Sequence, residues 1–299
     1  RSTMNLNDCT LCPRKCHKNR AAGEKGVCLA AGGEGYLARA ALHFWEEPCI
    51  SGTKGSGAVF FSGCNLKCVF CQNYEISSEH YGKTISIERL REIYRELIAK
   101  GAHNINLVTP SHFSDAILES LDSPLPVPVV YNTNGYESVD NLKRFDGKVQ
   151  IYLPDIKYSN DELAVRYSHA PDYFETAKKS ILEMFRQTGK YRLDPETGLM
   201  KSGVIIRHLL LPNHLENTIN VIDWVAETFQ PGDIMFSLMR QYVPHGRAYE
   251  FPELSRKVSD EEYQAVEDYL FASPLEDGFV QEEESASTEF IPEFDGSGV

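Results

Sequence analysis

Six short apolar segments recur along most of the chain, and their alternation with helical patterns limits the possible folds more than any other feature. The segments have the length and the β-branched and aromatic content of buried strands, and helical patterns follow most of them. Strands that alternate with helices favour right-handed crossovers and a parallel sheet covered by helices. The six predicted strands span residues 58 to 63, 104 to 109, 127 to 132, 149 to 155, 204 to 211 and 234 to 239.

The helical pattern after the first predicted strand is the clearest one. Apolar residues recur at helical spacing from Ile87 to Ile98, with Ser86 in place to cap the start and Gly101 to end the helix. Similar patterns cover residues 111 to 121, 160 to 189, 215 to 229 and 259 to 271. Six such units predict an α/β fold, either an open doubly wound sheet or a partial (β/α)6 barrel.

Polar segments follow four of the predicted strands. They are SGCNLKC after the first strand, VTPSHF after the second, YNTNGY after the third and PDIKY after the fourth. In both candidate folds, ligands bind at the carboxyl ends of the parallel strands. The sequence therefore predicts one functional face that carries all four segments.

The net charge and the hydropathy of the chain argue against nucleic acids and membranes as binding partners. The chain carries 43 acidic and 30 basic residues, a net charge of -13, which repels phosphate backbones and anionic lipid surfaces. No apolar run approaches the roughly 20 residues needed to cross a bilayer. We therefore expect a cytoplasmic protein whose substrate is neither a nucleic acid nor a membrane. Arg1, Ser2 and Thr3, which precede Met4, are interpreted as a tag remnant.

All of the cysteines lie in the first quarter of the chain, which predicts metal binding rather than disulfides in a reducing compartment. Three of them follow the first predicted strand with a CxxxCxxC spacing, and no cysteine lies further along the chain. A closed zinc site needs four protein ligands, whereas a cluster held by three thiolates keeps one iron open for a substrate or cofactor. The eight cysteines are Cys9, Cys12, Cys16, Cys28, Cys49, Cys64, Cys68 and Cys71.

Three regions follow from these patterns. Residues 1 to 45 form a cysteine- and glycine-rich module that is too small to bury a core by itself. Residues 46 to 272 form the barrel. Residues 273 to 299 are a tail, acidic at first and apolar near its end, and we expect this apolar end to pack against the barrel near the functional face.

The stretch CNLKCVFC resembles the signature of the radical S-adenosylmethionine enzymes, including the aromatic Phe70 before its last cysteine. The resemblance implies that Cys64, Cys68 and Cys71 ligate a 4Fe-4S cluster whose open iron chelates S-adenosylmethionine. It further implies reductive cleavage of that cofactor to a 5'-deoxyadenosyl radical, which abstracts a hydrogen atom from the substrate. An electron donor such as flavodoxin or ferredoxin is implied as well.

Between about residues 57 and 245 the chain is more specifically similar to the activating enzymes of pyruvate formate-lyase and other glycyl radical enzymes. Their DTNG and DLK strand ends correspond to NTNG, which begins at Asn132, and to DIK, which runs from Asp155 to Lys157. By this resemblance Lys157 pairs with the cofactor carboxylate, and Asp155 orients the lysine or helps to hold a cation. A solvated surface pair of the two charges is the alternative. Arg207 and His208 correspond to a strand beside the nucleoside, although histidine on an apolar strand is as often a core residue.

One departure concerns the amino group of S-adenosylmethionine. The family commonly has a GGE motif after the second strand, where this chain has TPSHF. Thr109, Ser111 and His112 are the candidate replacements. The sequence does not establish how the amino group is held.

The N-terminal set of Cys9, Cys12, Cys16 and Cys28 has four members, which suits a closed site. Zinc and a second 4Fe-4S cluster both remain open, and Cys49 is left over.

Three functions agree with the sequence. The first is a radical enzyme that acts on a protein or peptide, as the glycyl radical activases do. The second is a radical enzyme that modifies another peptide or a small molecule. The third is an iron-sulfur electron carrier, which would not need an open iron. The substrate, the physiological reductant and the oligomeric state cannot be predicted from the residues.

Overall fold

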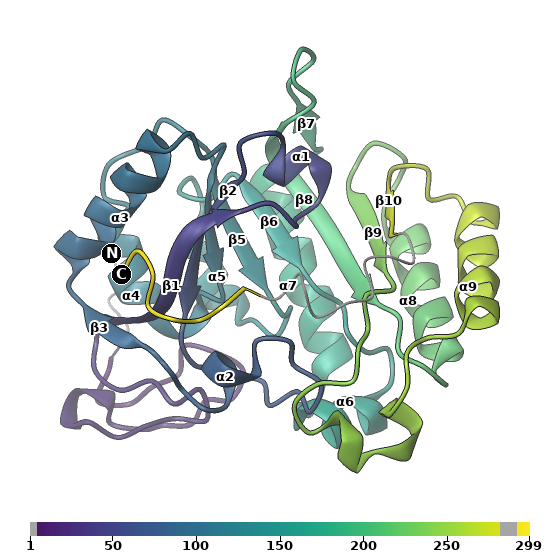
Figure 1. Ribbon diagram of the computed structural model, residues 1–299, viewed down its shortest axis with the longest axis horizontal. Helices are drawn as coiled ribbons and strands as arrows, with labels where there is room; N and C mark the ends of the chain where they lie inside the picture. Colours follow the sequence, from purple (N-terminus) through teal and green to yellow (C-terminus); the bar gives the residue numbers. More distant parts are fainter. Residues whose placement is uncertain (1–4, 282–291) are drawn as a thin grey trace.

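A computed structural model describes residues 5 to 281 and 292 to 299 of the chain. Its centre is a single ten-stranded sheet with the order β10-β9-β8-β6-β5-β4-β2-β1-β3, and β7 pairs with β8 beside this path (Figure 1). The strands are β1 (Gly35–His43), β2 (Ser56–Phe61), β3 (Lys83–Ile85), β4 (Ile105–Val108), β5 (Val129–Thr133), β6 (Ile151–Pro154), β7 (Arg192–Leu193), β8 (Met200–Leu209), β9 (Met235–Met239) and β10 (Gly278–Val280).

The six predicted strands are confirmed as the parallel centre of this sheet. They are β2, β4, β5, β6, β8 and β9, which pair in that order and in parallel throughout. The path ends at β10 on one side and at β3 on the other, so among the described residues the strands do not close into a complete barrel. The predicted α/β fold with a partial barrel is therefore present.

Strand β1 was not predicted, and it lies inside the segment that we assigned to the N-terminal module. It pairs antiparallel with β2, from Leu37 opposite Phe61 to His43 opposite Ser56. Residues 35 to 43 are therefore part of the main sheet. The short strand β3 pairs antiparallel with the start of β1 and extends this edge.

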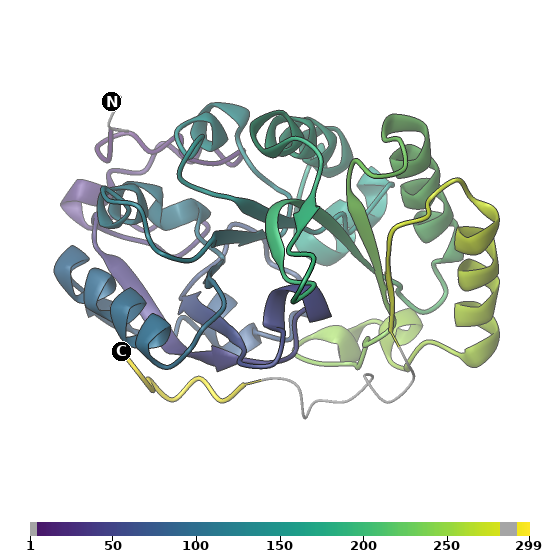
Figure 2. The ribbon, with the colours of Figure 1, turned by 90° about the horizontal axis from the view of Figure 1, so that it is seen from above.

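Helices cover the outer side of the sheet, as Figure 2 shows from above. Helix α3 begins after Ser86, whose side chain accepts a hydrogen bond from the Arg89 amide at 3.1 Å, as the sequence predicted. The continuous pattern over residues 160 to 189 divides into two helices, α6 and α7. The helices are α1 (Pro48–Ser51), α2 (Tyr74–Ser77), α3 (Ile87–Ala99), α4 (Ser114–Ser120), α5 (Val139–Lys143), α6 (Asp161–Ser168), α7 (Tyr173–Thr188), α8 (Leu215–Thr228) and α9 (Asp260–Ala272), with 3-10 turns at Arg20–Ala22, Ser111–Phe113, Ala248–Glu250 and Pro252–Leu254.

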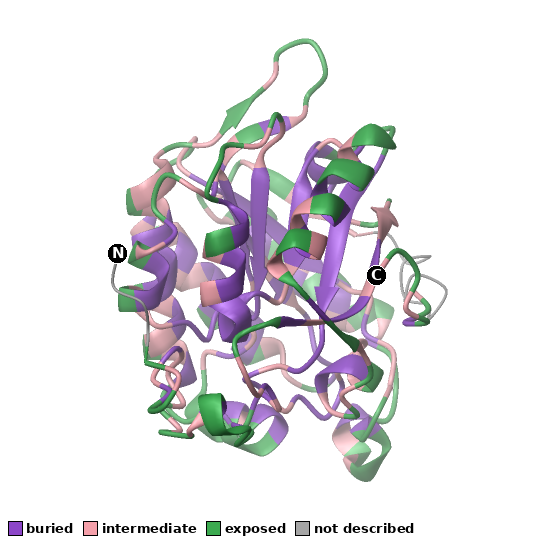
Figure 3. Cartoon of the chain, turned by 90° about the vertical axis from the view of Figure 1, so that its left-hand side faces the viewer, coloured by how far each residue is buried: buried purple, intermediate pink, exposed green. Residues whose placement is uncertain are grey.

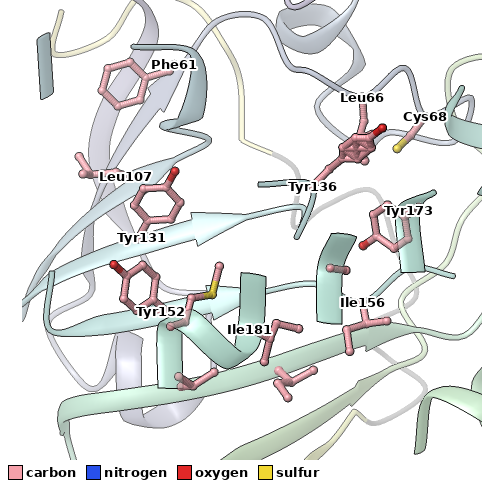
Figure 4. Close-up of a cluster of buried hydrophobic side chains, with 14 of the residues drawn as sticks. Phe61, Leu66, Cys68, Leu107, Tyr131, Tyr136, Tyr152, Ile156, Tyr173 and Ile181 are labelled. Carbon is pink, nitrogen blue, oxygen red and sulfur yellow. The ribbon is translucent and has the colours of Figure 1, made fainter. Parts of the chain in front are cut away.

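The core lies between the strands and these helices. The central strands are almost entirely buried, while the outer faces of the helices are exposed (Figure 3). Figure 4 shows that aromatic side chains fill much of this core, among them Tyr131 and Tyr152, and that Cys68 lies at the end of the cluster near Tyr136 and Tyr173. No described helix has the length and apolar character needed to span a membrane.

The C-terminal segment docks on β1, as the sequence predicted. The Gly296 amide donates to the Ala38 carbonyl at 2.9 Å, and the Ala40 amide donates to the Ser297 carbonyl at 2.9 Å. Phe294 is buried and meets Phe60 edge to face with ring centroids 5.4 Å apart. Residues 1 to 4 and 282 to 291, which include the expected tag remnant and two of the apolar tail residues, lie outside the described residues.

Candidate active site

One cavity of about 390 Å³ lies along the sheet and receives side chains from nearly every central strand. The loop after β2 contributes Cys64, Cys68 and Cys71. The ends of the next strands contribute the other predicted cofactor contacts that reach this cavity, namely Thr109, Asn132, Asp155, Lys157 and Arg207. The carboxyl ends of the parallel strands thus meet at one site, as predicted.

The cysteine loop is held by backbone contacts on both sides. The amides of Lys67 and Val69 donate to the carbonyls of Ser168 and Tyr167, at 3.2 and 2.8 Å. Gly63 has φ +83°, and a Cβ atom there would lie 2.0 Å from the Cys28 carbonyl oxygen. Only glycine permits both this conformation and this contact, so the N-terminal module packs directly against the start of the loop.

Each of the three sulfurs accepts a side-chain hydrogen bond. Ser168 Oγ donates to Cys68 Sγ at 2.9 Å, Ser77 Oγ to Cys71 Sγ at 3.3 Å, and Asn134 Nδ2 to Cys64 Sγ at 3.3 Å. The donors come from the end of α6, from α2 and from the turn after β5. Three elements that are distant in the sequence therefore orient the three sulfurs.

The donor set fits an iron-sulfur cluster better than a single ion. Burial raises the pKa of Cys68 to about 12 and also raises that of Cys71, so these thiols ionise only when a strong positive charge binds them. Within residues 5 to 281 and 292 to 299, no three His, Cys, Asp or Glu side chains converge as ligands of one ion. In a cluster each thiolate binds a different iron, and three cysteines around one cavity suit that arrangement.

Lys157 and Asp155 form an ion pair beside the cysteines. Lys157 Nζ lies 3.2 Å from Asp155 Oδ2. Burial alone would lower the pKa of Lys157, but the charges of Asp155 and Cys68 raise it above its ordinary value. Gly135, at φ +84°, would place a Cβ atom 2.3 Å from the Asp155 carbonyl oxygen, so a glycine is required where the NTNG turn meets the DIK turn.

Arg207 occupies the centre of a polar network in the cavity wall. Its guanidinium donates to Glu46 Oε2 at 2.8 Å, to Asp155 Oδ1 at 3.2 Å and to Asn132 Oδ1 at 2.6 Å. The carboxylates of Asp155 and Glu46 outweigh the effect of burial and raise the pKa of Arg207. A permanent positive charge in the wall is therefore fixed by three acceptors from different elements.

Three predicted contact residues do not line the cavity. The Ser111 hydroxyl donates to buried Glu137. His112 donates from Nε2 to the Ser62 carbonyl at 2.7 Å, and burial lowers its pKa to about 3. His208 donates from Nδ1 to the Ile156 carbonyl at 2.6 Å and accepts from Thr218 at 2.7 Å. Burial lowers the pKa of His208 to about 4, so it is a neutral link between strand and helix.

The sequence interpretation missed an acidic part of the cavity. Glu46 and Glu47, which lie between β1 and α1, line it together with Ser237 of β9. Their loop is held by Ser51, whose Oγ accepts from the Glu46 amide at 3.0 Å and donates to the His43 carbonyl at 3.2 Å. Only the recognition of residues 35 to 43 as a strand would have drawn attention to the two glutamates that follow it.

The four N-terminal cysteines lie near one another. A Cβ atom on Gly26 would lie 3.0 Å from Cys16 Sγ and 3.6 Å from Cys28 Sγ, so these two sulfurs flank the glycine. Cys9 and Cys28 are buried, and burial raises the pKa of Cys12 to about 12. A zinc site needs four convergent ligands, and the described residues do not show that convergence. The metal at these cysteines stays a prediction, and Cys49 is buried apart from the cavity lining.

A model of the Radical SAM superfamily matches residues 58–224. The uncharacterized protein MJ0674 of Methanocaldococcus jannaschii is 32% identical over 267 residues, which is 86% of this chain and 72% of that protein. The matched range includes the three cysteines and the ends of β4, β5, β6 and β8.

Several solved structures align with part of the chain at low identity. Streptococcus suis SuiB bound to the precursor peptide SuiA aligns with a TM-score of 0.49 at 14% identity, over 73% of this chain and 46% of SuiB. Methylornithine synthase (PylB) aligns with a TM-score of 0.48 at 13% identity, over 79% of this chain and 68% of PylB. HydG, a maturase of the [FeFe]-hydrogenase, aligns with a TM-score of 0.49 at 15% identity, over 78% of this chain and 53% of HydG. The chain spans about half the length of SuiB and HydG.

Proposed function

This chain belongs to the radical SAM superfamily, and we propose that it is an enzyme which abstracts a hydrogen atom from a protein or peptide, in the manner of the glycyl radical enzyme activases. Membership of the superfamily implies a 4Fe-4S cluster and S-adenosylmethionine as cofactors. The activase-like substrate is the specific part of the proposal.

One observation carries the enzymatic part. Cys64, Cys68 and Cys71 line the same cavity as the ion pair of Lys157 with Asp155. When bound, the cluster and S-adenosylmethionine supply a 5'-deoxyadenosyl radical to this cavity. An electron carrier has no use for a buried cavity with oriented charges beside its cluster, so the arrangement favours catalysis over electron transfer alone.

Different residues of the cavity bind different parts of the cofactor in this proposal. Lys157 Nζ pairs with the cofactor carboxylate, while Asp155 keeps the lysine charged and in place. Thr109, which follows β4 where the family has a GGE motif, lines the cavity and would offer its hydroxyl to the cofactor amino group. Asn132 accepts from Arg207 at 2.6 Å and lines the cavity, where by the resemblance it would meet the methionine part of the cofactor. The surrounding apolar side chains exclude water from the reacting atoms.

The incomplete closure of the sheet supports a protein or peptide substrate. The strand path stops at β10 and does not rejoin β1 within the described residues. The cavity reaches this gap, since Phe279, Val280 and Pro292 belong to its lining. The C-terminal segment borders this gap, and we infer that an extended segment of a partner enters beside it, a lateral route that a closed barrel does not offer. A small-molecule substrate remains the alternative.

Anaerobic reconstitution tests the enzymatic part. After reduction, the reconstituted protein should show a 4Fe-4S signal in electron paramagnetic resonance that changes on addition of S-adenosylmethionine, and it should form 5'-deoxyadenosine. The triple variant Cys64→Ala, Cys68→Ala, Cys71→Ala should lose both properties. Cys49→Ala is the matched control and should retain them, since that thiol is outside the cavity lining. Formation of 5'-deoxyadenosine by the triple variant at the parent rate would refute the assignment.

Isotope transfer tests the activase-like part. Candidate protein partners and peptides are deuterated at their glycine α-carbons and incubated with the reduced enzyme and S-adenosylmethionine. Mass spectrometry of the 5'-deoxyadenosine should then show deuterium from a polypeptide partner. Deuterium that arises only from deuterated small molecules would favour the alternative and contradict the activase-like proposal.

A further inference from the structure

Two segments outside the superfamily match line the cavity together with the cysteines. Glu46 and Glu47 precede the matched residues 58–224, while Ser237 and Gln241 follow them. The part common to the superfamily supplies the cluster ligands and most of the strand ends. The substrate differs from one member of the superfamily to another. We therefore expect substrate contacts in the segments outside residues 58–224.

The cavity lining carries more carboxylates than positively charged side chains. Two cations, Lys157 and Arg207, face three carboxylates, Glu46, Glu47 and Asp155. Lys157 pairs with Asp155 at 3.2 Å, and Arg207 pairs with Glu46 at 2.8 Å and with Asp155 at 3.2 Å. The remaining carboxylate is Glu47, whose Oε2 lies 4.0 Å from the Arg207 guanidinium, beyond hydrogen-bonding distance.

Glu47 is a buried carboxylate with one oxygen, Oε2, that accepts no hydrogen bond in the described part of the chain, although the group is hydrogen-bonded to Ser237. Only 7% of its side chain is exposed, and burial raises the pKa of Glu47 above its ordinary value. A carboxyl oxygen left in this condition costs stability unless a ligand satisfies it, so its position on the cavity indicates a binding function.

We propose that Glu47, with Ser237 beside it, is a substrate subsite that binds a cationic nitrogen group, a primary ammonium or a guanidinium. The subsite rests on the proposed function, because it places the remainder of the substrate in the cavity that the cysteines share. A lysine or arginine side chain of a polypeptide carries such a group, and so does a small amine. The neighbouring Arg207 is neutralised by Glu46 and Asp155 and does not repel the cation.

Small cations serve as probes of this subsite. Binding of n-butylammonium and n-butylguanidinium to the full-length reconstituted protein is measured by titration calorimetry, with and without S-adenosylmethionine. Butyrate and butyramide are the anionic and neutral controls. At least one cation should bind saturably and the controls should not. In the Glu47→Gln variant, the dissociation constant for the cation should rise roughly tenfold or more, because a hydrogen bond between charged groups is lost.

Two further variants serve as controls for the binding measurement. Glu227→Gln removes an exposed carboxylate from α8 and should bind the cations as the parent does. Glu47→Asp keeps the charge on a shorter side chain and should bind them with intermediate affinity, and it carries the test if Glu47→Gln does not fold.

Measurements with S-adenosylmethionine distinguish a failure of the Glu47 subsite from a failure of the proposed enzymatic function. Glu47→Gln should bind S-adenosylmethionine with the affinity of the parent. Equal weakening of S-adenosylmethionine binding would assign Glu47 to the cofactor and overturn the subsite. Absence of saturable binding by both cations, or equal binding by the parent and Glu47→Gln, would also overturn it. A parent that binds the cations but does not cleave S-adenosylmethionine would refute the proposed function and leave the subsite standing.

Discussion

Ser168 Oγ donates a hydrogen bond to Cys68 Sγ at 2.9 Å, and the Tyr158 hydroxyl lies 2.6 Å from the same serine oxygen. The serine ends helix α6, one hundred residues beyond the cysteine in the sequence. Since Ser168 donates to sulfur, Tyr158 donates to Ser168. The relay fixes the direction of a hydrogen bond to a cluster ligand from inside the core, where all three side chains are buried.

Removal of this hydrogen bond should lower the reduction potential of the cluster. A hydrogen bond to a ligand sulfur stabilises the reduced, more negative cluster, so its loss makes reduction harder. Ser168→Ala should therefore shift the midpoint potential downward in a titration followed by electron paramagnetic resonance, with the iron content unchanged. The control Ser180→Ala alters a buried serine that bonds to the Glu137 and Thr176 carbonyls and should leave the potential unchanged. Equal potentials in the parent and Ser168→Ala would contradict this role.

Substitution of Lys157 should weaken the binding of S-adenosylmethionine without loss of the cluster. A hydrogen bond between a cation and a carboxylate is worth about 1.5 to 3 kcal/mol, which corresponds to roughly tenfold or more in the dissociation constant. Equilibrium binding to reconstituted Lys157→Ala measures the effect. Lys190→Ala removes an exposed lysine 3.9 Å from Asp233 and should bind the cofactor normally. Unchanged affinity in Lys157→Ala would make the lysine a partner of Asp155 only.

The central strands were predictable because parallel strands buried on both faces are continuous apolar runs. The segment GYLARAALH of β1 has no such run, and its strand character comes from pairing with β2 and with the C-terminal segment. Tertiary contacts therefore decide the structure of this edge. Glu46 and Glu47 lie in the loop after β1, which ends at His43, so without a prediction of this strand the acidic part of the cavity was missed as well.

The site itself was predictable only where a motif marked it. The cysteines and Lys157 belong to motifs and line the cavity as predicted. Ser111 was a candidate replacement for the GGE motif, and His208 was a candidate only by correspondence to a family strand, with a core position as the alternative. Both side chains turn into the core, toward Glu137 and Thr218. Ser168 lies where the helical pattern breaks, at a left-handed His169 with φ 54°, and no sequence pattern relates that break to Cys68.

Glu137 should make stability depend on pH in the acidic range. Burial raises its pKa to about 6, although Ser111, Thr133 and Tyr131 donate hydrogen bonds to its carboxylate. The folded state therefore binds more protons than the unfolded state between about pH 4.5 and 6, and this contribution to stability decreases as pH rises through that window. The cost at neutral pH is about 2 kcal/mol, from a pKa shift of about 1.5 units.

The Glu137→Gln variant isolates this contribution. The free energy of unfolding is measured by urea denaturation from pH 4.5 to pH 7.5 for the parent and the variant. The parent should lose about 2 kcal/mol relative to Glu137→Gln as the pH rises. A difference that stays constant with pH would show that the carboxyl has the same pKa in the folded and unfolded states.

The docked C-terminal segment should stabilise the protein and shield the cavity. Phe294 packs on Phe60, and Pro292 belongs to the cavity lining. Deletion of residues 292–299 should lower the melting temperature. It should also increase the 5'-deoxyadenosine formed without substrate turnover, because water and reductant reach the radical more easily.

Two glycines of this segment distinguish docking from local backbone strain. Gly296 and Gly298 both have positive φ, +80° and +75°, so alanine at either position costs about 1 to 2 kcal/mol of backbone strain. A Cβ atom on Gly296 would meet nothing within 4 Å, whereas one on Gly298 would lie 2.0 Å from the Ala40 carbonyl oxygen. Gly298→Ala should therefore undock the end of the chain and reproduce the deletion, while Gly296→Ala should lower stability only slightly and keep cleavage coupled. Equal behaviour of the two variants in melting and in uncoupled cleavage would show that contact with β1 does not hold the segment in place.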